Sequence, residues 1–220
     1  MTSGSDSVLL VVCTANVCRS PLVESVLRRR LPETHGPLAT VVLRSAGTRA
    51  VPGQPMCPVS GAESADDGFV QSHRARLLES GLIGGADLVL TAEREHRGAA
   101  ARLAPGSQAR VFTFLEAVAL AEVAVQRVRA GEVDPPEDLR DVAAILHASR
   151  GRIPLAEAPQ PPRGLFRRRE RVVPVHPLDL EDGHGQPPAE HEAAARRTHD
   201  LAERLATALA ELTAPRAVEA

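Results

Sequence analysis

Near the start of this 220-residue chain, Cys13 and Arg19 are separated by the five residues Thr14 to Cys18. A loop of this length that runs into the start of a helix points successive backbone N–H groups toward its centre, where an oxyanion can bind. The arginine offers a planar fork of donors that matches two oxygens of a phosphate group. These groups favour negative charge, so Cys13 should ionise readily and act as a nucleophile at neutral pH. The spacing therefore predicts attack on a bound phosphate and a phosphoryl-cysteine intermediate.

The residues around this pair indicate the elements that hold it. Val8 to Val12 is a continuous apolar run with β-branched residues, which is typical of a strand buried on both faces. Ser20 is expected to cap a helix that has Pro21 at its first position and continues with apolar residues at helical spacing to Leu31. The cysteine–arginine spacing alone arises often by chance, and Cys13 could then be an ordinary core residue. The strand before it and the helix after it favour the phosphate-binding interpretation.

Residues Cys13 to Pro21 read CTANVCRSP, which resembles the phosphate-binding loop of the bacterial-type low-molecular-weight protein tyrosine phosphatases, whose usual pattern is C-x-G-N-x-C-R-S-P. Ala15 takes the glycine position, where the question is whether the backbone needs a positive φ angle. The resemblance implies catalytic roles for Cys13 and Arg19, and no metal or organic cofactor. It also implies that the phosphate is bound by Thr14, Ala15, Asn16, Val17, Cys18, Arg19 and Ser20.

Two further segments match the same family: Ser45-Ala46-Gly47, and residues 72–77 with the sequence SHRARL. Taken alone, the histidine at position 73 would be interpreted as a surface residue before a short helix. A loop whose amides face a ligand leaves other polar groups that must be satisfied elsewhere. The resemblance implies that a hydrogen-bonded network supports the loop, formed by Asn16, Ser20, Ser45 and His73.

A phosphoester leaving group needs a proton as the P–O bond breaks, and in this family an aspartate on a loop before the last helix supplies it. Here residues 180–185 precede a predicted amphipathic helix from about Ala189 to Leu212. By order along the chain the general acid is Asp182, with Gly183 and His184 in place of the usual proline and aromatic residue. Two rivals are Asp179 and Asp134, which has the literal Asp-Pro dipeptide but sits in an irregular segment.

Strands and helices alternate along the first 128 residues. After the first strand, further strands are predicted at Thr40 to Arg44, Ala86 to Thr91 and Ala109 to Phe114, and helices at about 58–69, 93–103 and 115–128. This alternation predicts a four-stranded parallel sheet in a doubly wound, three-layer α/β/α fold. The resemblance implies that the fold is of the phosphotyrosine protein phosphatase I-like type. Right-handed crossovers place the loop at the carboxyl edge of the sheet, where ligands bind in open α/β folds.

The chain is expected to form one domain, residues 1–220, with an elaborated irregular segment at about 130–178. Within that segment, residues 138–150 can form one helix with its apolar residues on one face. Arg167 to Arg171 is arginine-rich and is most simply a solvated face. A docking patch for an acidic or phosphorylated partner is the alternative.

Composition excludes several classes of function. The net charge of −2 gives no electrostatic case for nucleic acid, and all 26 basic residues are arginine, which excludes a Walker-type nucleotide loop and a Schiff-base mechanism. The three cysteines have no zinc-type spacing, so no metal site is predicted, and Cys57 is expected to be a small packing residue. Neither a leader-like N-terminus nor an apolar run of membrane length is present. We therefore expect a cytoplasmic protein with no membrane partner.

These features predict a phosphoric monoester hydrolase, most simply a protein-tyrosine phosphatase. The resemblance implies a phosphotyrosine protein or a small aryl phosphate as substrate, with a cognate tyrosine kinase or kinase substrate as partner. The alternatives are a thioredoxin-coupled arsenate reductase, which would need two further cysteines in a mobile segment after the loop, and a phosphate-sensing regulator without turnover. A redox role is also predicted for Cys18, which can form a reversible disulfide with Cys13 unless it simply packs behind the loop.

Overall fold

The computed structural model describes residues 7–34, 36–153 and 176–214. Its centre is a sheet of four parallel strands in the order β2-β1-β3-β4. The strands are β1 (Val8–Cys13), β2 (Val42–Gly47), β3 (Leu88–Thr91) and β4 (Val111–Thr113). All four predicted strands are therefore present, in the predicted parallel arrangement. β1 lies between β2 and β3, so the loop that follows it opens at the carboxyl edge where the strand order reverses.

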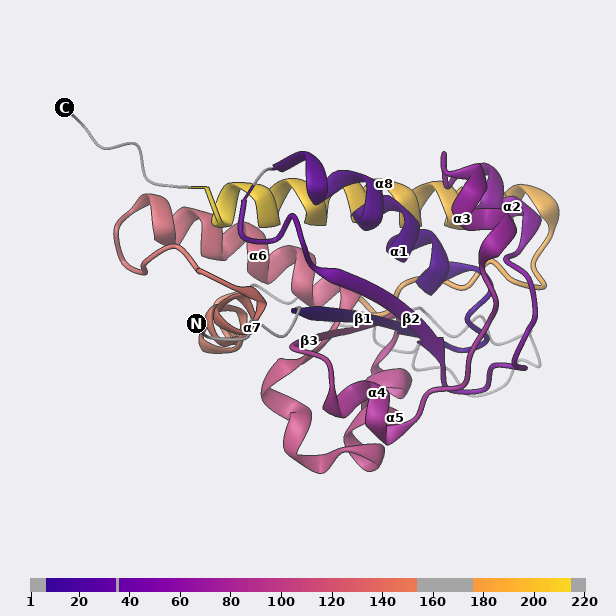
Figure 1. Ribbon diagram of the computed structural model, residues 1–220, viewed down its shortest axis with the longest axis horizontal. Helices are drawn as coiled ribbons and strands as arrows, with labels where there is room; N and C mark the ends of the chain where they lie inside the picture. Colours follow the sequence, from indigo (N-terminus) through magenta and orange to yellow (C-terminus); the bar gives the residue numbers. More distant parts are fainter. Residues whose placement is uncertain (1–6, 35, 154–175, 215–220) are drawn as a thin grey trace, which may run out of the picture.

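Helices cover both faces of the sheet, as Figure 1 shows. One face carries α1 (Arg19–Arg30), α6 (Phe114–Arg129) and α8 (Pro188–Leu212), and the other carries α4 (Ser80–Gly84) and α5 (Arg94–Leu103). The core is correspondingly divided, because alternate residues of β1 point to opposite faces. Leu9 and Val11 pack with α1, α6 and α8, whereas Leu10 and Val12 pack with the second layer. The predicted three-layer α/β/α architecture is confirmed.

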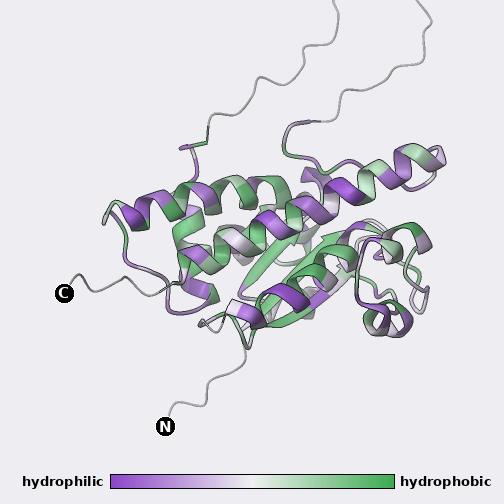
Figure 2. Cartoon of the chain, turned by 90° about the horizontal axis from the view of Figure 1, so that it is seen from above, coloured by the Kyte–Doolittle hydropathy of each residue, from purple (hydrophilic) through white to green (hydrophobic). Residues whose placement is uncertain are grey.

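The last helix, α8, lies along α1 and α6 with one apolar face buried between them. Figure 2 shows the resulting alternation of hydrophilic and hydrophobic residues along its length. The buried positions recur at three- and four-residue spacing, as an amphipathic helix requires, and include Leu201, Leu205, Leu209 and Leu212. The helix predicted from about Ala189 to Leu212 is confirmed, and it begins beside the carboxyl edge of the sheet.

Two local predictions need correction, and one short helix was missed. The helix expected at 58–69 is two short helices, α2 (Pro58–Ala62) and α3 (Asp67–Ser72), because Ala65 has a φ of 55° and the Asp66 carboxylate caps the second one. Ser20 is not a helix cap: α1 begins at Arg19, so Ser20 lies in its first turn. The short α4 was not predicted.

Between α6 and α8, the residues that the structure describes contain one further helix, α7 (Leu139–Ala148), close to the bounds predicted for it. Asp138 caps this helix by accepting hydrogen bonds from the backbone of its first turn. Leu139 and Leu146 are fully buried against the rest of the core, so α7 is part of the packed structure. The arginine-rich run at 167–171 lies outside the described residues. Among the helices that the structure describes, none is both long and apolar enough to cross a bilayer.

Gly47, at the end of β2, lies directly against the loop that follows β1. A Cβ atom at this position would stand 2.6 Å from the carbonyl oxygen of Thr14 and 2.8 Å from the backbone nitrogen of Asn16. These contacts are to backbone atoms, which cannot move aside without moving the loop. The Gly47 N–H also donates to the Arg76 carbonyl, and the Gly47 carbonyl accepts from the Leu78 N–H. These two hydrogen bonds prevent β2 from moving away from the loop. A residue without a side chain is required here.

We expect Gly47→Ala to lower the free energy of unfolding by about 1–3 kcal/mol, because the added methyl group overpacks this contact. Gly81→Ala is the matched control. Nothing lies within 4 Å of a Cβ built on this helical glycine, so alanine there should be neutral or stabilise by about 0.4–1 kcal/mol. Urea unfolding midpoints of the two variants test this. Equal midpoints would mean that the loop yields freely at Gly47.

Candidate active site

The loop between β1 and α1 curls around the sulfur of Cys13. The Asn16 backbone N–H donates a hydrogen bond to Cys13 Sγ over 3.3 Å, and Ser20 Oγ lies 3.0 Å from the same sulfur. The left-handed backbone conformation falls on Asn16, which has a φ of 57°, and not on Ala15. Asparagine tolerates this conformation better than most residues. Alanine at the usual glycine position is therefore compatible with the loop.

Asn16 is also the centre of a buried hydrogen-bond network. Its side-chain amide donates to Ser20 Oγ over 3.0 Å and to Ser45 Oγ over 2.8 Å, and its side-chain oxygen accepts from the Arg76 backbone N–H. Its backbone carbonyl accepts a hydrogen bond of 2.8 Å from His73 Nε2. The structure thus brings together all four residues for which the sequence resemblance implied a supporting network. His73 is buried within it and is not a surface residue.

Arg19 is 5% exposed and is held from several directions. Its Nη1 donates to Glu93 and to the carbonyl oxygen of Leu180, and its Nη2 lies 2.6 Å from Asp182 Oδ2 and 3.3 Å from Thr14 Oγ1. Burial lowers the pKa of the guanidinium, but the negative charges of Cys13, Asp182 and Glu93 outweigh burial and raise it. Arg19 is therefore a fixed positive charge beside the sulfur, with carboxylates on both of its terminal nitrogens.

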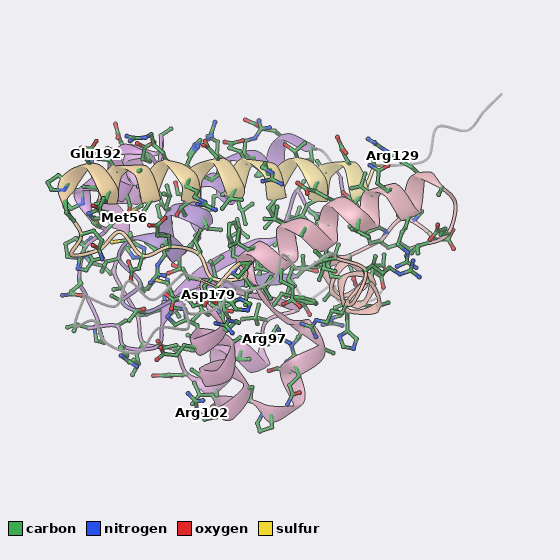
Figure 3. The ribbon with its side chains drawn as sticks, turned by 180° about the vertical axis from the view of Figure 1, so that it is seen from behind. Met56, Arg97, Arg102, Arg129, Asp179 and Glu192 are labelled. Carbon is green, nitrogen blue, oxygen red and sulfur yellow. The ribbon has the colours of Figure 1, made fainter. Side chains whose placement is uncertain are left out.

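The segment 179–184 reaches this cluster and is fastened at several points. Asp179 accepts hydrogen bonds from the backbone and side chain of Arg94, the first residue of α5, and the Leu180 N–H bonds to the Ala92 carbonyl. Figure 3 shows Asp179 between α8 and the α5 layer. Asp182 Oδ1 accepts the His184 N–H over 3.0 Å. Asp182 thus lies at the site, and Asp179 anchors its segment to α5.

Asp134, the rival with the Asp-Pro dipeptide, lies at the other end of the molecule. It follows Arg129, the last residue of α6, whose guanidinium pairs with Glu211 near the end of α8. Glu211 comes twenty residues after His191, so about 30 Å of helix separates them. Figure 3 shows Arg129 at the end of the structure opposite Glu192. The structure brings Asp182, and not Asp134, to the loop.

Two residues of this site were not predicted, Glu93 and His96. Both lie at the start of α5, where the carboxyl end of β3 meets the loop, and His96 is 2% exposed. The Glu93 backbone N–H donates to His96 Nδ1, so in the neutral ring Nε2 carries the proton and donates to Thr14 Oγ1 over 2.9 Å. The signal that could have identified them is that both are polar residues shortly after a predicted buried strand. These two residues fix the side of the loop opposite Asn16.

The second loop cysteine, Cys18, turns its sulfur away from the network around Cys13. It lies 3.4 Å from His184 Nδ1 and within 4.8 Å of the sulfur of Cys57. The interaction between these two neighbouring thiols lowers the pKa of Cys57 to about 4 and raises the pKa of Cys18. Cys57 is buried in a small apolar cluster with Val17, Ala50 and Ala75, as expected of a packing residue. The disulfide between Cys18 and Cys13 stays a prediction.

The two buried histidines make stability depend on pH. Burial lowers the pKa of both His73 and His96 below the ordinary value. Below about pH 6.5 the unfolded chain therefore binds protons that the folded protein does not, so the free energy of unfolding falls as the pH falls and levels off below the folded pKa.

Urea unfolding from pH 7.5 to 5 should show this fall in the free energy of unfolding, and His73→Gln and His96→Gln should each flatten it. His199→Gln, on α8, is the control; a profile unchanged in both test variants would contradict the assignment.

Comparisons with known proteins agree with this geometry. The model of the family described as low molecular weight phosphotyrosine protein phosphatase matches residues 8–136, which include the loop, Ser45 and His73 but not Asp182. Wzb of Salmonella typhi, a low molecular weight protein-tyrosine-phosphatase, is 36% identical over 107 residues, which are 48% of this chain and 67% of that protein.

Two solved structures share the fold. Wzb of Vibrio vulnificus, in complex with benzylphosphonate, has a TM-score of 0.55 at 19% identity and covers 92% of this chain and 99% of its own. The YwlE arginine phosphatase of Geobacillus stearothermophilus has a TM-score of 0.54 at 20% identity and covers 91% of each chain. Because the family model spans more than half of the chain, this protein belongs to the low molecular weight phosphotyrosine protein phosphatase family.

Proposed function

We propose that this protein hydrolyses phosphoric monoesters through a cysteinyl-phosphate intermediate, as a protein-tyrosine phosphatase. One observation carries the proposal: Cys13 Sγ receives the Asn16 N–H and lies against the Ser20 hydroxyl, with the buried charge of Arg19 beside it. Hydrogen-bonding groups and a fixed cation therefore surround the sulfur that makes the attack. The same groups favour a phosphate group held in front of the sulfur.

In the first step the Cys13 thiolate attacks phosphorus in line, so the S–P bond forms as the bond to the leaving oxygen breaks. Arg19 and the loop amides hold the equatorial oxygens and balance their charge. Asp182 gives its proton to the leaving oxygen, so the product departs as a neutral alcohol or phenol. Asp182 suits this role better than Glu93, whose side chain is committed both to Arg19 and to the start of α5.

In the second step Asp182, now a carboxylate, takes a proton from water as the water oxygen attacks phosphorus and the S–P bond breaks. Inorganic phosphate is released, and Asp182 is protonated again. The Ser20 hydroxyl, 3.0 Å from the sulfur, stabilises the departing thiolate. The cycle needs no net oxidation or reduction, because the protein supplies the charge stabilisation and both proton transfers.

The ion pair between Asp182 and Arg19 connects phosphate binding to the position of the proposed general acid. Asp182 Oδ2 lies 2.6 Å from Nη2, the edge of the guanidinium that faces Thr14 in the loop. A phosphate dianion carries more charge than a carboxylate, so it competes for this edge. Displacement from Arg19 would free the Asp182 side chain to face the leaving oxygen, as the first step requires.

The proposed substrates are phosphotyrosine proteins or small aryl phosphates, and the proposed partner is a tyrosine kinase or its substrate. The chain has no tyrosine or tryptophan, and Val51, shortly after β2, is 58% exposed. Since the fold is shared with an arginine phosphatase, phosphotyrosine, phosphoserine and phosphoarginine peptides should be compared. Highest kcat/KM on phosphotyrosine is the expected result. We place the protein in the cytoplasm, where Cys13 would stay reduced.

The two alternatives stay distinguishable. A phosphate-sensing regulator would bind phosphate without turnover of any ester. A thioredoxin-coupled arsenate reductase would need a cysteine relay from Cys13, whereas Cys57 is buried beside Cys18. Arsenate reduction that depends on thioredoxin would favour the arsenate reductase over the phosphatase.

Cys13→Ser should reduce kcat for nitrophenyl phosphate by about 10³-fold or more, because the variant lacks the nucleophile. Phosphate should still bind, since Arg19 and the loop amides remain. Stopped assays, thermal melting and phosphate calorimetry on the same preparation separate lost chemistry from lost fold. A serine variant with about a tenth of the wild-type rate would contradict the proposed mechanism.

Asp182→Asn should slow an alkyl or tyrosyl phosphate by about 10²–10⁴-fold, and a nitrophenyl ester far less, because an activated leaving group needs no proton. Asp134→Asn replaces an aspartate at the far end of the molecule and is the matched control. The measurement is kcat across phenyl phosphates of graded leaving-group acidity. If the leaving-group dependence steepened in the Asp134 variant instead, the acid would be wrongly assigned.

A further inference from the structure

Beside the phosphate loop, two cysteines and two histidines converge from four separate segments. Cys18 precedes α1, Cys57 precedes α2, His184 follows Asp182, and His191 lies in the first turn of α8. One ligand atom from each of the four residues lies within 4.8 Å of all the others. The sequence spacing did not predict a metal site, because no two of these residues are close neighbours in the chain.

The distances match a tetrahedral site. Cys18 Sγ is 3.4 Å from His184 Nδ1, and Cys57 Sγ is 3.5 Å from His191 Nε2. Zinc bonds of about 2.3 Å to sulfur and 2.0–2.1 Å to nitrogen, at tetrahedral angles, put a sulfur and a nitrogen ligand about 3.6 Å apart. Two edges of the tetrahedron thus already have the right length. Two thiolates and two imidazoles are a ligand set that Zn²⁺ prefers.

The surrounding backbone is shaped to bring these ligands together. Gly183 is buried, and a Cβ there would stand 2.8 Å from the Cα of His191 and 2.9 Å from the Cβ of Ala194. The absence of a side chain lets the Asp182 segment lie against α8. The His184 and His191 rings consequently meet edge to face, with centroids 6.0 Å apart. The proline usual at this position would collide with α8.

The sulfur atoms have the surroundings of metal ligands. Cys18 and Cys57 are buried, with 7% and 9% of their surfaces exposed, so both sulfurs are sheltered from bulk water. His184 is exposed, so the cluster is open to solvent on one side and a metal ion can reach it.

We propose that Cys18, Cys57, His184 and His191 form a zinc site that fastens the Asp182 segment to the phosphate loop and to α8. The bound ion does not touch the reacting atoms. It joins the loop through Cys18 and the acid segment through His184, whose N–H holds Asp182. The proposed zinc site is argued only from the geometry of the four ligand residues. Its effect on catalysis rests also on the proposed role of Asp182.

The test uses the full chain with any affinity tag removed, and Zn²⁺ and Co²⁺ as probes. Wild type should contain one zinc per chain by mass spectrometry of the metal, and Co²⁺ should give the intense absorption of a tetrahedral thiolate site. His184→Asn and Cys57→Ser should each weaken zinc binding by more than about 100-fold. His184 is exposed, so its replacement leaves the core intact.

Two controls make the result specific. His199→Asn changes a histidine two turns further along α8 and should keep one zinc per chain. Cys13→Ser should also keep it, which excludes zinc bound by the nucleophile. Loss of zinc in the Cys13 variant, full binding in His184→Asn, or a metal-free wild type with a disulfide between Cys18 and Cys57 would each overturn the site.

The effect on catalysis is measured separately. Zinc removal with a chelator should lower kcat on phenyl phosphate several-fold more than kcat on nitrophenyl phosphate, with recovery on adding Zn²⁺ back. If zinc binds but its removal changes both rates equally, the positioning role is overturned while the site stands. If no zinc binds and hydrolysis through Cys13 persists, the site fails and the proposed function does not.

Discussion

The site depends first on how the backbone turn at Asn16 is held. A loop that closes around a sulfur atom leaves polar groups pointing into the protein, and each must find a partner. Asn16 reaches α1 through Ser20, β2 through Ser45, and the segment after α3 through His73 and Arg76. Its own N–H meets Cys13. A disturbance in any of these elements therefore reaches Cys13 directly.

A buried guanidinium imposes the second constraint. Taking an arginine out of water costs free energy unless charges and hydrogen bonds compensate. For Arg19 the compensation comes from Glu93 after β3 and from Asp182 and the Leu180 carbonyl before α8. The contacts that neutralise the cation are thus the ones that bring Asp182 to the loop. Packing of α8 against α1 then fixes where that segment can lie.

Sequence reasoning reached the parts of this structure that local pattern determines. The strands, the long helices and the loop after β1 follow from periodicity and from one motif, and Asp182 could be placed by its order before α8. The break at Ala65 and the roles of Glu93 and His96 could not be predicted, because they depend on a backbone turn and on contacts between distant segments. The cysteine and histidine cluster joins residues up to 173 positions apart, which only the folded chain brings together.

The most direct test of the account is to trap the intermediate. Wild-type protein mixed with an excess of nitrophenyl phosphate and quenched in acid within milliseconds should carry one phosphate on the peptide that contains Cys13, bound to sulfur and released at the rate of turnover. Phosphate found on a histidine or serine, or continued turnover with no phosphoenzyme and no burst of nitrophenol, would contradict a cysteine nucleophile and the geometry assigned to it.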